Sequence, residues 1–555
     1  MKKILLFLCF LTFYSKIQAQ WTSDTTINTI VRDTAGATTP LMATTTNGST
    51  YISWFEYGIG GNFELRMQLL DSNGYKLWAP EGIIVSNYPQ NTALFRYDLK
   101  ADNDGNAVVA FQDERSGVLN AVAYKVTSTG TLAWGVAGIS LIDSAAQDGI
   151  APVIGITTNN DVVIAWNSNS LSSKWISVQR FSPSGTPRWN NIYQIRDTVG
   201  SLKYSRPELL PSGYDNILML FVEENGSFPG VTSTLYAQKI GAFGINSWTT
   251  PVKVSTKTIP YFVFPEPVSD MAGGMYVAFN SSNPVSTSLI DVYVQHVDST
   301  GILWSATGTE AANSTANNKL AQSACYVEAS GEFWVLLRIQ NGGQSLSGVS
   351  VQKFDASGNV LLGSDAFVVI PMTADNYIPN TINDAFDGVI FSTSFGGFSA
   401  MHVFAMKLSY NGTLLWSALP VSLCAVNSNK DDLASGKFIG NNLVFAWQDD
   451  RGGSSGVFAQ NISGDGNIGI VTGIKNNILS KEILLFPNPS SAPILKLKEG
   501  KHSLMLIDAS GQKLFAQEVS SPFYYFSEFE KLSPGIYLVR VENDKVVETI
   551  KWLKE

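Results

Sequence analysis

The sequence holds 555 residues, more than one ordinary hydrophobic core supports, so several domains or one repeat array are expected. Hydrophobic residues make up 45% and charged residues 15% of the chain, a composition that excludes intrinsic disorder. Residues 21–480 hold 24 basic and 36 acidic residues, and this excess of 12 negative charges argues against a nucleic-acid-binding surface or a surface for anionic membranes. The 47 glycines and the aromatic content of 11% favour β-strands joined by tight turns.

The first 19 residues have the pattern of a secretory signal peptide. Lys2 and Lys3 form a basic start, and an apolar run follows over residues 4–14. Ala19 is a small residue at the expected cleavage point, which leaves Gln20 as the mature N-terminus. The apolar run is too short to span a bilayer, and no later stretch approaches a membrane span. We therefore expect an exported protein without an integral membrane segment.

A turn of the form D/S-x-x-G, usually followed four residues later by Trp, recurs along the chain with a period of about 56 residues. Examples are DSNGYKLW (71–78), TSTGTLAW (127–134) and SYNGTLLW (409–416). The turn glycines are Gly74, Gly130, Gly185, Gly244, Gly301, Gly358, Gly412 and Gly466. Glycine suits a hairpin corner because such a position often requires a positive φ.

A second marker keeps a fixed distance from the first. The residues six positions before these glycines are Gln68, Tyr124, Gln179, Gln238, Gln295, Gln352, Met406 and Gln460. An apolar run such as AVVAFQ (107–112) or LVFAWQ (443–448) stands upstream of each. Two markers at fixed spacing over eight copies indicate a true repeat.

Each repeat is interpreted as an apolar strand, a variable loop, a strand ending near the Gln, a glycine turn, a third strand through the Trp, and a short apolar segment. Four short strands in such a period are typical of β-propeller blades. The sequence therefore predicts an all-β fold with a propeller of eight blades, or seven if one terminal unit is incorporated differently. Residues 28–36 (NTIVRDTAG) resemble residues 193–200 (YQIRDTVG), so an N-terminal strand is expected to complete the last blade.

The C-terminal segment predicts a separate small β-sandwich of immunoglobulin-like form. It opens with Phe486-Pro487-Asn488-Pro489, continues with LMLIDASGQKLF (504–515), whose turn holds Gly511, and reaches Leu532-Ser533-Pro534-Gly535-Ile536-Tyr537 before a basic last strand. In this order the motifs resemble the type A C-terminal sorting domain of the type IX secretion system of Bacteroidota. The resemblance implies Sec-dependent export, contact with the type IX machinery, passage across the outer membrane, and release or attachment at the cell surface.

The expected organisation has four parts. These are a signal peptide (1–19), a propeller (20–473), a linker (474–482) and the sorting domain (483–555). Beyond the signal peptide the only cysteines are Cys325 and Cys424, which are expected to be two separate buried thiols.

Candidate catalytic chemistry is sparse, and no catalytic, cofactor-binding or metal-binding residue is assigned. Only His296, His402 and His502 exist, which disfavours histidine metal sites and most histidine-based triads. The repeated glutamines are expected to satisfy backbone groups between blades, and the repeated tryptophans to pack between blades. Residues 102–106 (DNDGN) contain part of a calcium-loop pattern, but a plain turn is the favoured interpretation.

Two carboxylate-rich loops occupy equivalent places in the second and eighth repeats. They contain Asp113, Glu114 and Arg115 in one case, and Asp449, Asp450 and Arg451 in the other. Carboxylates on a propeller rim are able to act as an acid–base pair, whereas an Asp–Arg pair simply braces a loop. Bracing is the favoured interpretation, because the pattern recurs at repeat-equivalent positions.

The sequence thus predicts a secreted or surface-attached, non-catalytic propeller for recognition, adhesion or scaffolding. A glycan or a surface protein is the expected kind of ligand, with the variable loops between strands tuning the binding. The alternative is a hydrolase of extracellular polysaccharide that uses the rim carboxylates.

Overall fold

The computed structural model describes most of the chain after the N-terminal segment. The described residues are 21–33, 36–58, 61–90, 96–213, 215–227, 229–261, 263–283, 286, 288–397, 399–416, 420–469, 484–486, 490–497, 500–521, 523–529, 531–542 and 547–554. The predicted signal peptide with Ala19 and Gln20, and the predicted linker, lie outside them. Two compact units make up the chain, Met1–Ile470 and Val471–Glu555.

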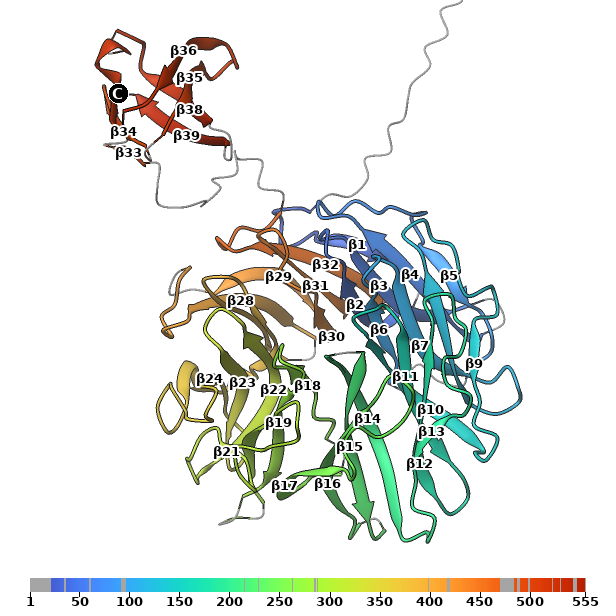
Figure 1. The fold of residues 1–555 in the computed structure, drawn as a ribbon. Helices are drawn as coiled ribbons and strands as arrows, with labels where there is room; N and C mark the ends of the chain where they lie inside the picture. The colour runs from blue at the N-terminus through green and yellow to red at the C-terminus, as the bar shows by residue number, and fades with distance from the viewer. Residues whose placement is uncertain are drawn as a thin grey trace, which may run out of the picture. The chain divides into compact units, whose positions relative to one another are not determined.

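The first unit contains eight four-stranded antiparallel sheets, the blades of a propeller (Figure 1). The first strands of blades 1 to 8 are β2 (Thr38–Thr44), β6 (Asp98–Ala101), β10 (Asp148–Ile156), β14 (Leu202–Ser212), β18 (Pro267–Ser269), β22 (Asn317–Val327), β26 (Ile378–Asp384) and β30 (Lys430–Ser435). The second strands are β3 (Thr50–Tyr57), β7 (Ala107–Asp113), β11 (Val162–Asn169), β15 (Asn216–Asn225), β19 (Met275–Ser282), β23 (Glu332–Asn341), β27 (Gly388–Phe395) and β31 (Asn442–Asp449).

The remaining two strands of each blade complete the sheets. The third strands are β4 (Phe63–Leu70), β8 (Asn120–Val126), β12 (Lys174–Phe181), β16 (Thr232–Ile240), β20 (Ile290–Val297), β24 (Ser347–Phe354), β28 (Met401–Ser409) and β32 (Gly456–Ser463). The fourth strands are β5 (Ile83–Ser86), β9 (Ile139–Leu141), β13 (Tyr193–Ile195), β17 (Val252–Ile259), β21 (Thr309–Glu310), β25 (Phe367–Thr373), β29 (Val421–Ser428) and, for blade 8, β1 (Thr29–Arg32).

The first strands form the inner wall of the ring, since each contacts the first strands of both neighbouring blades. The prediction of eight blades is confirmed, but the predicted strand assignment within a repeat is wrong in two respects. The inner strand lies upstream of the apolar run and was not predicted. The Trp segment forms only an isolated bridge, such as Leu70 to Lys76 or Val126 to Leu132, because the chain is still turning there after the glycine.

The hydrophobic core lies between blades rather than at a common centre. Second and third strands carry apolar side chains on both faces, so that every residue of β7 (AVVAFQD) and of β24 (SGVSVQKF) is buried. A cluster of buried residues forms between each pair of neighbouring blades, from the one around Phe55 and Phe111 to the one around Ile52 and Val444. Each buried aliphatic or aromatic side chain contributes about 1.5–3 kcal/mol, which makes every seam between blades a separate store of stability.

The repeated glycine and tryptophan meet across these seams. All eight turn glycines adopt a positive φ, from 74° to 94°. The tryptophan of one blade lies against the turn glycine of the next: a Cβ on Gly358 would come within 2.7 Å of Trp304, and one on Gly466 within 2.9 Å of Trp416. The indole Nε1 of Trp304 also donates to the carbonyl oxygen of Ala356 in that turn at 2.9 Å. The expected packing of these tryptophans between blades is therefore observed.

The N-terminal segment closes the ring as the sequence predicts. β1 pairs with β32 in blade 8, with Thr29 opposite Ala459. The eighth repeat lacks its own tryptophan, and Trp21 takes that place: its indole donates to the carbonyl oxygen of Ser72 at 2.9 Å and lies against Gly74. Gln460 donates to the carbonyl oxygen of Thr22 at 2.8 Å.

The second unit is an immunoglobulin-like β-sandwich. One sheet holds β33 (Leu484–Phe486), β34 (Ile494–Lys496) and β37 (Phe523–Tyr525), and the other has the order β36 (Lys513–Val519), β35 (His502–Asp508), β38 (Gly535–Glu542) and β39 (Val547–Lys554). A 3₁₀ turn spans Phe526–Phe529. The unit has its own core around Leu504, Val539 and Trp552.

Candidate functional site

The rim carboxylates of the second and eighth repeats are structural braces. Asp113 pairs with Arg115 and Asp449 pairs with Arg451, both at 2.6 Å, and both carboxylate side chains are fully buried. Burial opposes the charge of Asp449, yet hydrogen bonds from Arg451 and Ser428, together with Lys430, lower its pKa. A carboxylate held ionised in this way is a poor proton donor.

Other blades hold a buried carboxylate in a similar environment. Glu56 pairs with Arg32 at 2.8 Å, Glu224 with Arg206 at 3.2 Å, and Asp291 with Lys319 at 2.7 Å. These groups belong to the repeat, so they give no reason to place an acid–base pair at the two predicted loops. Glu114 and Asp450 lie in those same loops, where Asp450 accepts a hydrogen bond from the backbone of Asn429 at 2.8 Å.

The repeated glutamines bond backbone groups, mostly within their own blade. Gln179 donates to the carbonyl oxygen of Trp189 at 3.2 Å, and Gln238 to that of Trp248 at 3.2 Å. Gln295 and Gln352 also reach the preceding blade, through the carbonyl oxygens of Val254 and Ala311 at 3.0 Å. The expected contact between blades is therefore found at these two of the glutamines whose bonds are described.

A further recurring residue was not predicted from the sequence. It follows the repeated glutamine, or Tyr124 and Met406 where these replace the glutamine. Lys125, Arg180, Lys239, Lys353 and Lys407 stand there, and each donates to a backbone carbonyl in the next blade at 2.7 to 3.2 Å. His296 has this place in blade 5 and bonds Asp270 at 2.9 Å. The recurrence of a basic residue five positions before the turn glycine was a visible signal for it.

The remaining sequence candidates have structural roles. Asp102 caps its turn by accepting from the backbone of Asp104 and Asn106, and it pairs with Lys125 at 2.7 Å, so the turn interpretation fits the geometry. Cys325 and Cys424 are both free and buried. Within the described part of the chain, no three His, Cys, Asp or Glu side chains are grouped for a metal ion.

The inner strands bulge at the same level around the ring. Their ladders shift register next to Thr39, Ala151, Arg206, Gln322, Asn380 and Asp432. Four of these residues have a φ between 49° and 55°, which is costly for non-glycine residues and is typical of functional sites. These are Thr39, Ala151, Arg206 and Asp432.

Amide side chains from the preceding blade hold these bulges in place. The backbone N–H of Ala151 donates to Gln112 Oε1 at 3.1 Å, that of Arg206 to Asn167 Oδ1 at 3.0 Å, and that of Ala321 to Asn280 Oδ1 at 3.0 Å. Gln448 accepts in the same way from Thr39 at 3.2 Å across the closing seam. These bonds fix the strained backbone at one level of the inner strands.

A cavity of about 450 Å³ lies among these bulges, and the segments that line it are called the channel mouth below. Its walls come from the connection before β18 and the start of that strand (Val263–Val268), from the middle of β19, and from the bulges of β22, β26 and β30. Phe264 contributes a ring that is 50% exposed, while Gln322, Asn380 and Thr381 contribute amide and hydroxyl groups. The volume lies within the range of small-ligand sites.

Three charged residues, each from a different blade, lie at or next to this cavity. Arg96, just before β6, pairs with Glu208 of β14 and lies 3.4 Å from Glu266, which lines the cavity. Burial raises the pKa of Glu208 to about 7, although Arg96 acts in the opposite direction. A buried carboxyl group beside a cavity, with its pKa raised to near neutrality, has a property expected of an acid or base catalyst.

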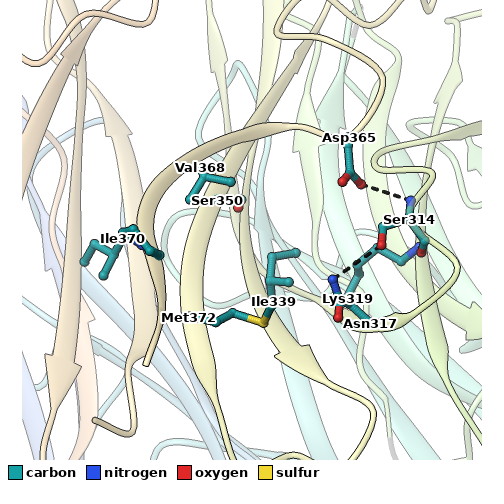
Figure 2. A pocket seen from close by; sticks show the side chains of 10 residues that line it. Ser314, Asn317, Lys319, Ile339, Ser350, Asp365, Val368, Ile370 and Met372 are labelled. Carbon is teal, nitrogen blue, oxygen red and sulfur yellow. Dashed lines mark hydrogen bonds between the residues drawn. The ribbon is translucent and has the colours of Figure 1, made fainter. Parts of the chain in front are cut away.

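A second cavity of about 260 Å³ lies in blade 6 (Figure 2). Its apolar side is formed by Ile339, Val368, Ile370 and Met372. The polar residues Ser314, Asn317, Lys319 and Asp365 bond within the protein. Asp365 accepts from the backbone N–H of Ser314 at 2.9 Å, and Lys319 donates to the carbonyl oxygen of Ala312 at 2.9 Å besides its ion pair with Asp291. The channel mouth is therefore the better candidate for a ligand site.

Comparison with known proteins identifies the C-terminal unit. Residues 484–555 match the family described as the secretion system C-terminal sorting domain, as the sequence motifs predict. No curated protein matches the chain. No helix in the described residues has the length and apolar character needed to cross a membrane.

Comparison with solved structures finds similarity at low identity and low TM-score. A polysaccharide lyase of family PL25, an ulvan lyase, is 11% identical over 81% of this chain and 97% of its own, with a TM-score of 0.42. PorZ of Porphyromonas gingivalis, a surface component of the type IX secretion system, is 12% identical over 93% of this chain and 70% of its own, with a TM-score of 0.28. A protein of unknown function from Dyadobacter fermentans is 12% identical over 56% of this chain and 93% of its own, with a TM-score of 0.35.

The predicted sorting-domain residues lie in strand ends and turns. Phe486 ends β33, and Pro487, Asn488 and Pro489 lie outside the described residues. Gly511 has a φ of 89° in the turn between β35 and β36, and Gly535 opens β38 after Pro534. The hydroxyl of Tyr537 donates to the carbonyl oxygen of Ser533 at 2.8 Å.

These observations establish where the protein acts. An eight-bladed propeller with its own core is joined to an immunoglobulin-like unit that matches the sorting domain. Export through the outer membrane is the purpose of that domain. The chain is therefore a β-propeller protein that carries a type IX secretion sorting domain and is secreted or attached to the outer cell surface.

Proposed function

We propose that the propeller is a non-catalytic recognition module that binds a sugar residue of an extracellular or surface glycan in the cavity at the channel mouth. The observation that carries this proposal is the cavity itself, which combines a half-exposed aromatic ring with amide side chains on a strained, braced backbone. Small-ligand sites commonly combine an apolar wall with a few fixed polar groups.

The polar groups suit a ligand rich in hydroxyls. Asn380 uses its Nδ2 to donate to the carbonyl oxygen of Ile378 at 3.0 Å, and Gln322 uses its Nε2 to donate to that of Ala321 at 3.3 Å. Their side-chain oxygens remain acceptors for sugar hydroxyls. The ring of Phe264 offers a flat apolar face on which the C–H face of a sugar packs.

Hydrolysis of polysaccharide is the second candidate function, and it would use residues other than those of the two rim loops. Asp113 and Asp449 are committed to Arg115 and Arg451, so a rim acid–base pair has no support. Glu208, with its pKa near 7, and the 77% exposed side chain of Glu266 would be the acid–base residues instead.

A glycan array with the exported protein tests the proposal, with bound protein and released reducing ends both recorded. We expect binding without release. Phe264→Ala should weaken binding by about tenfold, the cost of losing one well-packed aromatic contact. Phe243→Ala is the matched control, because Phe243 is 86% exposed in the turn between β16 and β17, at the opposite end of the strands. Release of reducing ends that Glu208→Gln abolishes would instead establish the hydrolase.

The route of export also belongs to this proposal. Sec-dependent export with cleavage between Ala19 and Gln20 would leave Trp21 one residue from the mature N-terminus, where it is needed at Gly74. Removal of the sorting domain near residues 474–482 would then free the propeller or leave it on the surface. N-terminal sequencing and the intact mass of the exported protein test both cleavage sites.

A further inference from the structure

Arg338 occupies a position in its blade where several other blades carry an amide side chain that holds the next bulge. In four blades the equivalent position of the second strand carries an amide, Gln112, Asn167, Asn280 or Gln448, which accepts the backbone N–H of the next bulge. A guanidinium has no acceptor and is unable to make this bond. Blade 6 therefore carries at this place a side chain that the repeat does not require.

The charge of Arg338 has no carboxylate partner among the described residues. Its guanidinium donates to Asn376 Oδ1 at 2.7 Å, and its buried Nε makes no described hydrogen bond. Most arginines of the propeller, such as Arg115 and Arg206, pair with a buried carboxylate. Arg196 also lacks a described carboxylate, but it lies over the ring of Trp175 at 4.0 Å.

Arg338 is equivalent in position to a residue that lines the cavity. Asn280, its equivalent in blade 5, lines the cavity and bonds the bulge of blade 6. Arg338 stands one blade further along the ring, and its partner Asn376 lies four residues before Asn380, which also lines the cavity. In the ladder between β22 and β23, Arg338 pairs with Leu320, the neighbour of the lining residue Ala321. Its bond to Asn376 places the guanidinium at the seam between blades 6 and 7.

A cation kept in such a place has an energetic cost. Burial lowers the pKa of Arg338, with no opposing contribution from a neighbouring acid. Desolvating a charged group without a counter-ion is unfavourable, so an anion that arrives there gains a charge-assisted hydrogen bond. The planar fork of arginine matches a carboxylate or a sulfate with two parallel bonds.

We propose that Arg338 is the anchor for an anionic group, so that the channel mouth binds an acidic glycan whose sugars carry carboxylate or sulfate. This inference rests on the proposed glycan recognition and specifies its ligand class. The net charge of −9 disfavours non-specific attraction of polyanions, which makes the local cation decisive.

Titration calorimetry of the exported protein tests the inference with three matched oligosaccharides. These are a uronate oligomer, its carboxyl-reduced neutral form, and a sulfated neutral oligomer. We expect the uronate or the sulfated sugar to bind at least about tenfold more tightly than the neutral form. Whichever anion binds more tightly identifies the ligand group.

Arg338→Gln is the informative variant, because it restores the amide that other blades carry. It should reduce affinity for the acidic sugar by about tenfold or more and leave affinity for the neutral sugar unchanged. Arg338→Lys keeps the charge without the fork and should lose part of the preference. Arg196→Gln, the matched control, should change neither affinity.

The outcomes separate this inference from the proposed function. Equal binding of acidic and neutral sugars by the unaltered protein would overturn the inference and leave glycan recognition intact. An equal loss of both affinities in Arg338→Gln would show a merely structural role and would also overturn it. Absence of binding to every glycan on the array would remove the proposed function, and the inference with it.

Discussion

Single glycines hold the seams between blades because they accept both a left-handed backbone and an indole ring. Gly358 shows both demands, with a φ of 84° and with Trp304 so close that a Cβ would lie 2.7 Å from the ring. Gly363 has a similar φ of 86°, but nothing lies within 4 Å of an added Cβ. The two residues therefore separate the cost of backbone strain from the cost of the indole contact.

We predict that Gly358→Ala destabilises the propeller more than Gly363→Ala does. The backbone strain alone costs roughly 1–2 kcal/mol, which is the effect expected at Gly363. Displacement of Trp304 should add about 1–3 kcal/mol at Gly358. Chemical denaturation followed by Trp fluorescence measures both. Equal losses for the two variants would show that the Trp–Gly contact carries no stability.

Glu208 gives the stability of the propeller a dependence on pH. Burial raises its pKa from the ordinary 4.5 to about 7, so between these values the folded protein keeps a proton that the unfolded chain releases. Its contribution to stability is complete below pH 4.5 and is lost as the pH rises to about 7. The loss amounts to roughly 3 kcal/mol, at 1.36 kcal/mol for each pKa unit.

We predict that Glu208→Gln, which stays neutral, gains stability relative to the unaltered protein as the pH rises from 4.5 to 7.5. Denaturation at several pH values measures the difference in the free energy of unfolding. Arg96→Met removes the cation that opposes the shift and should move the dependence to higher pH. A difference that stays constant across this range would contradict the assignment.

At the scale of elements, the N-terminal segment supplies two parts that the eighth repeat does not contain, an outer strand and a tryptophan. β1 supplies the outer strand and Trp21 supplies the indole. Without them, β32, whose eight residues are all buried, would present an unpaired apolar edge. Such edges pair with other chains.

We predict that a mature chain lacking residues 21–32 forms oligomers or aggregates, while the chain beginning at Gln20 remains monomeric. Size-exclusion chromatography with light scattering compares the two. A synthetic peptide of residues 21–32, added in trans during refolding, should restore the monomer. A truncated chain that is monomeric and melts at the same temperature would exclude the role of this segment in closure.

The sequence predicted the elements that carry strong periodic signals and missed those that do not. The apolar second strands, the glycine turns and the closing strand were visible, because their residues recur at fixed spacing. The inner strands were missed because they mix polar and apolar residues and bulge, as in β26, and because β18 has only three residues. The Trp segment was wrongly predicted as a strand, since an apolar segment after a turn has the same composition whether or not it pairs.

The candidate site was less predictable for a different reason. Arg96, Glu208 and Glu266 belong to the surroundings of blades 2, 4 and 5, and only closure of the ring brings them together. No local motif marks them. Arg338 was visible only as a departure from the amide found in other repeats, which becomes meaningful once the amides are known to brace the bulges.

At the scale of the whole molecule, the residues that recur in every repeat and the residues that differ between repeats have separate roles. The recurring glycines, tryptophans, basic residues and amides hold one blade to the next, so they would serve any ligand equally well. The residues at the channel mouth differ from blade to blade in charge, ring and amide, and in our proposal this asymmetry is what recognises the ligand. Substitution of a residue packed between two blades should therefore lower the stability of the propeller. Substitution of a residue at the channel mouth should lower the affinity for the ligand.

Each unit has its own hydrophobic core, so we expect the propeller to fold without the sorting domain. We predict that a chain ending at Ile470 folds into a propeller with an unchanged melting temperature but stays inside the outer membrane of its host. Immunoblots of the cell envelope, the cell surface and the medium measure its location, and calorimetry measures its stability. The full chain is the control, and it should reach the surface or the medium. A truncated chain found outside the cell would mean that the propeller itself carries an export signal, while a lowered melting temperature would mean that residues after Ile470 contribute to the propeller's core.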